Sequence, residues 1–100
     1  MNLTTTLDGN QATIAIEGKL SVATSPDLEK EISSLPATVS DFTLDLSDLE
    51  YISSAGLRVL VSTQKLATSR GGSMTLVHPR DEVMDVFEMT GLSDIFTIQR

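Results

Sequence analysis

Segments with a two-residue apolar period alternate along this chain with segments of helical period, and this alternation limits the fold more than any other feature. Apolar residues recur at every second position in residues 12–16 and 42–46, which is typical of half-buried strands. They recur three or four positions apart in residues 28–35, 57–67 and 83–87, which is typical of helices with one buried face. A chain with this order forms a sheet against which helices pack.

Turn and capping residues predict where the elements begin and end. Asp8-Gly9-Asn10 follows a polar segment over residues 3–7 and predicts an antiparallel hairpin with the next strand. Ser25 is predicted to cap the first helix, with Pro26 at its first position and Asp27 in its positive first turn. The other boundaries are set by the breakers Pro36, Gly71-Gly72, Pro79 and Gly91.

Together these segments predict a single α/β (α+β) domain over residues 1–100. We expect a mixed sheet of four to five strands with about three main helices packed against it, in the order β-β-α-β-α-β-α. Residues 74–77 supply the strand before the third helix, and residues 95–98 supply an optional last strand. The opening hairpin is antiparallel, whereas the strands joined by helices are parallel through right-handed crossovers.

The charge and the residue types narrow the function classes. The chain has 7 Lys and Arg against 14 Asp and Glu, a net charge of −7, and such a surface repels nucleic acids and anionic membranes. The absence of cysteine excludes disulfides, thiolate zinc sites and a cysteine nucleophile. No apolar run is long enough to span a bilayer, and the N-terminus lacks the regions of a leader sequence. We therefore expect a cytoplasmic protein without nucleic-acid partners or direct membrane insertion.

The residues needed for catalysis are missing from the sequence. It contains no phosphate-binding glycine loop and no nucleophile elbow around a serine, and its single histidine is His78. A hydrolase built on Ser54 and His78 would lack a third member, so His78 is interpreted as a loop residue. The acidic residues between 41 and 50 do not follow the spacing of a calcium loop and are interpreted as a solvated surface. We expect no enzymatic activity, no metal and no cofactor.

One segment, Ser53-Ser54-Ala55-Gly56, departs from ordinary helix-start chemistry. A serine here predicts an N-terminal cap, which is worth about 1 kcal/mol, but two adjacent serines exceed what one cap needs. The first turn has no Asp or Glu, unlike the other predicted helices. Gly56 lowers the stability of the helix by about 0.5–1 kcal/mol relative to alanine. A glycine at such a position is typical where something approaches the backbone closely. Such a helix start accepts an anion, so phosphorylating a serine would spare the fold and repel a docked partner.

These residues resemble those of a known family. Residues 44–47 (Leu-Asp-Leu-Ser) and 51–60 (Tyr-Ile-Ser-Ser-Ala-Gly-Leu-Arg-Val-Leu) are similar to the STAS domain of bacterial anti-sigma factor antagonists, also called anti-anti-sigma factors. Supporting matches are Gly18-Lys19-Leu20, Gly71-Gly72 and Met89-Thr90-Gly91-Leu92. The resemblance implies a sheet of four or five strands with helices, and a phosphorylatable serine at the N-terminus of the second long helix.

The resemblance also implies a partner-switching cycle. In the family, the unphosphorylated antagonist binds an anti-sigma factor that is a GHKL-type serine kinase. Phosphorylation by this kinase releases the antagonist, and a PP2C-type phosphatase restores the serine. Carried onto this chain, the phosphorylated residue is Ser54, with Ser53 as the second choice. The partner-binding residues implied by the resemblance are Ser21, Val22, Thr24, Ser53, Ser54, Gly56, Leu57 and Arg58.

The sequence departs from the family pattern around this serine. Ser53 stands where well-studied members have Asp, Ala55 stands where they have a second hydroxyl, and Ser21 replaces a frequent Asp beside the site. These changes are expected to alter recognition by the kinase. STAS-like proteins also serve as accessory subunits of lipid-transport ABC complexes, in which the domain is a permanent structural clamp without a phosphate cycle. This structural role is the alternative function.

Overall fold

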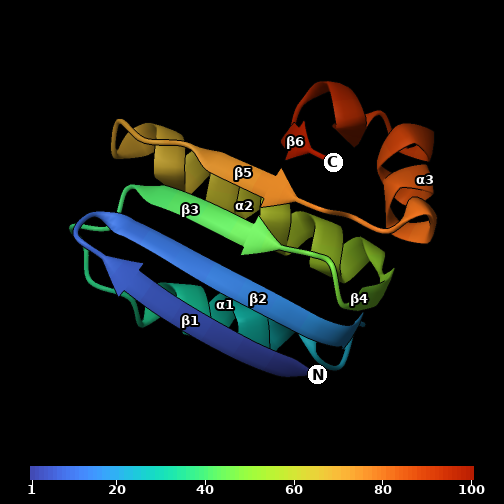
Figure 1. The fold of residues 1–100 in the computed structure, drawn as a ribbon, viewed down its shortest axis with the longest axis horizontal. Helices are drawn as coiled ribbons and strands as arrows, with labels where there is room; N and C mark the ends of the chain where they lie inside the picture. The colour runs from blue at the N-terminus through green and yellow to red at the C-terminus, as the bar shows by residue number, and fades with distance from the viewer.

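The computed structural model describes residues 1–100 as strands and helices in alternation (Figure 1). The elements are β1 (Asn2–Asp8), β2 (Gln11–Leu20), α1 (Ser25–Ser33), β3 (Asp41–Asp45), β4 (Leu49–Ile52), α2 (Ser54–Ser69), β5 (Met74–Val77), α3 (Asp81–Met89), the 3-10 helix η1 (Leu92–Asp94) and β6 (Thr97–Gln99). None of the helices has the length and apolar character needed to cross a membrane.

The sheet is mixed, as the sequence predicts. Its strand order is β1-β2-β3-β5-β6, with β1 antiparallel to β2 and all the other pairs parallel. Helices α1 and α2 lie side by side behind the sheet in the view of Figure 1. The predicted fold class, the antiparallel hairpin and the optional last strand are therefore confirmed.

The structure adds one strand that the sequence analysis did not predict. Strand β4 pairs in parallel with the C-terminal part of β2, whereas β3 pairs with its N-terminal part. The change of partner coincides with a register shift at Gly18, whose φ is +99°. The short β4 escapes a period-two search because Leu49 and Ile52 are buried while the two residues between them are exposed. With β4 the sheet has six strands instead of the predicted four to five.

The predicted cap of the first helix is wrong by one residue. Thr24 occupies the N-cap position of α1, and Ser25 is the first helical residue, with only 2% of its surface exposed. The Ser25 hydroxyl donates to the Ser21 carbonyl at 2.5 Å instead of accepting from the helix. Pro26 consequently lies one position later than predicted, which the helix tolerates because an N–H at the second helical position would have no i−4 acceptor within the helix.

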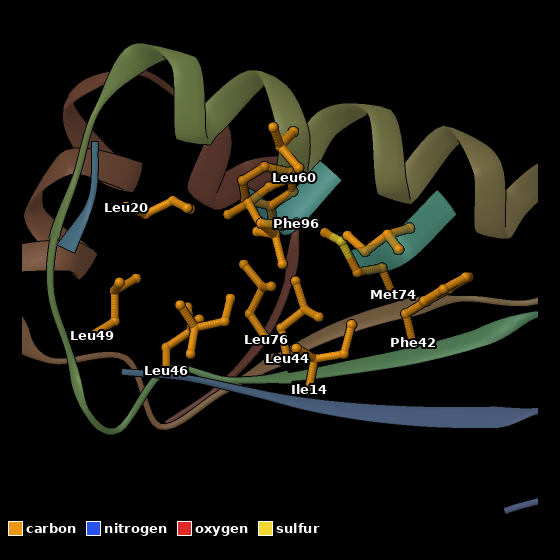
Figure 2. Packing of buried hydrophobic residues seen from close by; sticks show 14 of the residues in the cluster. Ile14, Leu20, Phe42, Leu44, Leu46, Leu49, Leu60, Met74, Leu76 and Phe96 are labelled. Atoms are coloured by element: carbon orange, nitrogen blue, oxygen red, sulfur yellow. The ribbon is translucent and has the colours of Figure 1, made fainter. Parts of the chain in front are cut away.

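The core lies between the sheet and the helices and contains 21 buried apolar residues. Ile14, Leu44 and Leu76 are in register on β2, β3 and β5 and are completely buried. Leu60 of α2 lies above them (Figure 2). Each such side chain contributes about 1.5–3 kcal/mol when it is removed from water, so this layer fixes α2 on the sheet.

A row of threonines crosses the other face of the sheet. Thr6, Thr13, Thr43, Thr75 and Thr97 are in register across β1, β2, β3, β5 and β6. Side chains alternate along a strand, so these threonines point away from the core layer. The branched Cβ of threonine suits a strand, and the hydroxyl keeps this face hydrated.

The end of α2 is fixed by a pair of glycines. The N–H of Gly71 donates to the Thr68 carbonyl and the N–H of Gly72 donates to the Ala67 carbonyl at 2.8 Å, which is a Schellman motif. Gly71 has a φ of +78°, whereas Gly72 lies against the backbone of Ser40. The two glycines are therefore required for different reasons.

These different reasons predict different costs. A Cβ at Gly72 would lie 1.9 Å from the Ser40 carbonyl oxygen, so G72A should lower the free energy of unfolding by at least about 3 kcal/mol. G71A meets no atom within 4 Å and should cost about 1 kcal/mol through its left-handed backbone alone. Urea denaturation of both variants measures the difference, and equal losses would contradict the packing argument.

Candidate functional site

The carboxyl ends of strands β2 and β4 lie side by side at one end of the sheet. The last pairs of β2 and β4 are Lys19 with Tyr51 and Leu20 with Ile52, and the N–H of Ser53 donates to the Leu20 carbonyl at 2.8 Å. The loop after β2 and the first turn of α2 are therefore held next to each other. In open sheets of this kind, the carboxyl ends of parallel strands are where binding surfaces usually form.

The two adjacent serines at this edge have different environments. Ser53 is the N-cap of α2, is only 7% exposed, and accepts a hydrogen bond from the Gly56 N–H at 3.2 Å. Ser54 is the first residue of the helix, is exposed, and its hydroxyl makes no hydrogen bond within the chain. The first turn contains no acidic residue, as predicted. The structural role of a cap therefore falls to Ser53 and leaves the Ser54 hydroxyl free.

Gly56 is required by the packing of the core. A Cβ at this position would lie 2.8 Å from Leu20 Cγ and 3.0 Å from Ile52 Cγ1, which are the last residues of β2 and β4. The sequence predicts a close approach to the backbone at this glycine, and the structure shows that the side chains at the ends of β2 and β4 make it.

The loop between β2 and α1 is held by its own hydroxyl groups. The Thr24 hydroxyl accepts from the Ser21 N–H and donates to the Lys19 carbonyl, both at 2.8 Å. The Thr24 N–H also donates to the Ser21 hydroxyl at 3.3 Å. Val22, at the outside of this loop, is 70% exposed. Ser21 and Thr24 therefore shape the loop, and Val22 is the side chain that it presents to solvent.

An open groove of about 400 Å³ runs between α1 and α2 next to Ser54. Its lining comes from the β2–α1 loop, α1 and α2: Val22, Ser25, Pro26, Glu29, Ala55, Arg58, Val59 and Ser62. Arg58 is exposed on its wall, whereas Leu57 is 8% exposed and belongs to the core beneath the helix.

The contribution of Glu29 and Ser62 to this groove was not predicted. It depends on α1 packing against α2, which is a tertiary contact that no local pattern encodes. The only signal in the sequence is the helical spacing of Ala55, Arg58 and Ser62, which places these three residues on one face of α2.

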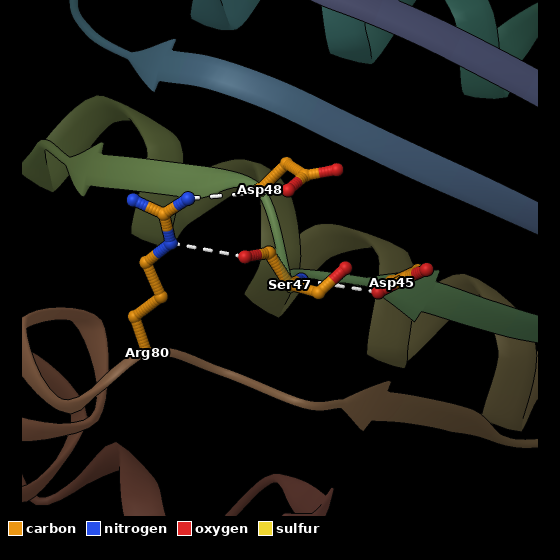
Figure 3. Close-up of polar contacts among 4 residues, drawn as sticks. All are labelled: Asp45, Ser47, Asp48 and Arg80. Atoms are coloured by element: carbon orange, nitrogen blue, oxygen red, sulfur yellow. Dashed lines mark hydrogen bonds and ion pairs between the residues drawn. The ribbon is translucent and has the colours of Figure 1, made fainter.

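Arg80 fixes the turn that leads into β4 (Figure 3). Its Nε donates to the Ser47 carbonyl at 2.9 Å, and its guanidinium lies 3.9 Å from an Asp48 carboxylate oxygen. The Ser47 N–H donates to the Asp45 carboxylate at 3.0 Å. Asp41 likewise accepts from the Ser73 N–H at 3.0 Å. Several acids that were interpreted as a solvated surface thus also hold turns of the backbone.

His78 lies at the junction of β5 and α3. It is exposed, its φ is +55°, and its N–H donates to the Gln99 carbonyl at 2.7 Å. No hydrogen bond connects His78 with Ser54 in the structure. This geometry agrees with the interpretation of His78 as a loop residue and gives no support to a hydrolytic pair.

The fold defines a class of small α/β domains with a mixed sheet, and comparison with known families identifies the family. The family model described as "Mlab, STAS domain" matches residues 3–98. The chain therefore belongs to the STAS domain family, as its sequence resemblance predicts.

Several relatives are anti-sigma factor antagonists. The anti-sigma-B factor antagonist of Bacillus subtilis strain 168 is 33% identical over 89 residues, which cover 89% of this chain and 82% of that protein. The anti-sigma-B factor antagonist of Staphylococcus aureus strain NCTC 8325 is 26% identical over 99 residues, which cover 98% of this chain and 92% of that protein. The unphosphorylated Bacillus anti-sigma factor antagonist SpoIIAA shares the fold with a TM-score of 0.85 at 16% identity, over 99% of this chain and 89% of that one.

The packing of Gly56 generates a prediction for the site. G56A should lower the free energy of unfolding by about 1–2 kcal/mol, because overpacking against Leu20 and Ile52 outweighs the better helix propensity of alanine. Ser62 is exposed on the same helix, so S62A should change stability by less than about 0.5 kcal/mol. Denaturation midpoints measure both. A neutral G56A would mean that the strand ends can move apart.

Proposed function

We propose that this protein is an anti-sigma factor antagonist that acts by partner switching in the cytoplasm. In its unphosphorylated form it binds a GHKL-type serine kinase that serves as the anti-sigma factor. Phosphorylation of Ser54 releases this partner, and a PP2C-type phosphatase reverses the modification. The chain acts as a binding module and not as an enzyme.

The exposure of Ser54 is the observation that carries this proposal. A kinase can reach the hydroxyl because Ser54 starts α2 at the surface, and modifying it breaks no hydrogen bond of the fold. In the transfer, Ser54 Oγ forms a bond to the γ-phosphorus of ATP, the bond from that phosphorus to the bridging oxygen breaks, and ADP leaves. The hydroxyl proton passes to a base of the kinase. The helix dipole stabilises the resulting phosphate by about 0.3–1 kcal/mol, so the fold tolerates it.

The groove between α1 and α2 supports the position of the partner. It begins at Ala55, next to Ser54, and combines exposed apolar surface at Val22 with a charged wall at Arg58. A partner that covers this groove also covers Ser54. A phosphate there adds about −1.5 to −2 charges to a chain whose net charge is already −7, and the partner would have to dehydrate it. Phosphorylation therefore weakens binding without a change of fold.

A second candidate function is a permanent accessory subunit of a lipid-transport ABC complex. One observation favours it. Ser53 stands where phosphorylated family members have Asp, and it is occupied as a helix cap. In this role the same groove would be a constant contact surface, and Ser54 would remain unmodified.

Phosphate transfer distinguishes the two candidates. Incubation with ATP and the cognate GHKL kinase should place one phosphate on Ser54, detected by mass spectrometry of the intact protein and its peptides. S54A should abolish labelling and keep its affinity for the partner. S53A should still be labelled, although loss of the cap lowers its stability by about 1 kcal/mol.

Two results would contradict this assignment in different ways. Labelling that persists in S54A and disappears in S53A would move the phosphorylation site to Ser53. Absence of labelling with every cognate kinase would favour the accessory-subunit function.

A charge at position 54 should act on the partner and not on the fold. S54D should weaken binding of the anti-sigma kinase at least about tenfold, because like charges and desolvation oppose docking. Its melting temperature should stay within a few degrees of the parent, because an acid suits a helix N-terminus. The control Q11E adds the same charge at the opposite end of β2 and should bind normally. Titration calorimetry and thermal melts measure both variants, and tight binding by S54D would refute the switch.

A further inference from the structure

Arg58 is the one arginine of the chain that has no partner. Of the four arginines, Arg70 donates to the Val39 carbonyl, Arg80 donates to the Ser47 carbonyl, and Arg100 pairs with Asp81 at 2.7 Å. Arg58 makes no hydrogen bond or ion pair and is exposed on the wall of the α1–α2 groove. Its guanidinium, with five N–H donors in a planar fork, is therefore free to bind an anion.

Arg58 lies one helical turn after Ser54 on α2. Arg58 follows Ser54 by four residues, so the two side chains are neighbours on one face of α2, with Cβ atoms about 5–6 Å apart. Helical side chains lean toward the N-terminus, so the side chain of Arg58 covers the turn that starts at Ser54. The other charged residue of the groove, Glu29 on α1, forms no ion pair with Arg58 and does not hold it elsewhere.

We propose that Arg58 is the internal counter-ion of the phosphoserine and pairs with the phosphate across one helical turn. This inference rests on the proposed phosphorylation of Ser54. Arginine and phosphate form short, charge-assisted and often bidentate hydrogen bonds. The N–H groups of Ser54 and Ala55, which have no acceptor within the chain, face the same end of the helix. Both sets of donors are therefore available to bind the phosphate.

The pairing adds a second effect to the switch. In the unmodified protein, Arg58 is available to a carboxylate of the partner at the groove wall. In the phosphorylated protein the phosphate pairs with the Arg58 guanidinium. The partner then meets the negative charge of the phosphate and can no longer bind the positive charge of Arg58. The partner expected at this groove therefore presents an acidic side chain to Arg58, which matches the single cation among the groove-lining residues.

The test places phosphoserine at position 54 during translation, so no kinase is needed. The phosphate is then titrated by phosphorus NMR in the parent, in R58Q and in K65Q. Lys65 is exposed on the same helix, but it lies about 16 Å from Ser54 along the axis, which exceeds the screening length of about 10 Å. The guanidinium favours the dianion, so R58Q should raise the second pKa of the phosphate by about 0.5 or more. K65Q should change it by less than about 0.2. Equal shifts in the two variants would refute the pairing.

Partner binding separates this inference from the proposed function. Without phosphate, R58Q should bind the anti-sigma kinase about tenfold more weakly than the parent, and K65Q should bind normally. If phosphoserine abolishes binding while R58Q leaves the phosphate titration unchanged, the switch stands and the pairing is wrong. If R58Q shifts the titration while the partner binds both phosphorylation states equally, the pairing stands and the proposed function is wrong.

Discussion

The parallel pairing of β2 with β4 is the constraint on which the site depends. Leu20 and Ile52 end these strands in register, and the carbonyl of Leu20 accepts the N–H of Ser53. This single alignment places the β2–α1 loop beside the first turn of α2 and closes the space around Gly56. Arg80 holds the turn before β4 and so secures the same alignment from the other end of the strand. Backbone pairing between β2 and β4 therefore sets the position of the site, and side chains at both ends of β4 support it.

The division of roles between Ser53 and Ser54 follows from helix geometry. A residue at the cap position turns its side chain toward the N–H groups of the first turn, and this hydrogen bond buries Ser53. The next residue already has helical geometry, and at this point of the turn it faces solvent. One serine therefore stabilises the helix while its neighbour stays available for chemistry. The hydroxyl of Ser53 is buried and engaged by the backbone, whereas that of Ser54 is exposed and makes no hydrogen bond within the chain.

Much of this architecture could be predicted from local chemistry. The period of apolar residues, the Asp8-Gly9-Asn10 turn and the Gly71-Gly72 end of α2 each act over a few residues, and each prediction is confirmed. Tertiary effects were missed. Strand β4 has no alternating pattern, and Gly56 is explained by the ends of two distant strands. The free guanidinium of Arg58 was equally hidden, because a sequence shows which residues are cationic but not which of them lack a partner.

The threonine face of the sheet has a consequence for how the domain meets other molecules. Five hydroxyl-bearing side chains in one row make the side of the sheet opposite α1 and α2 wettable from edge to edge. Because these hydroxyls bind water, an apolar surface that covers the row would gain little free energy from burial. The hydroxyls interrupt the apolar surface on this side of the sheet, which lowers its tendency to associate with other apolar surfaces.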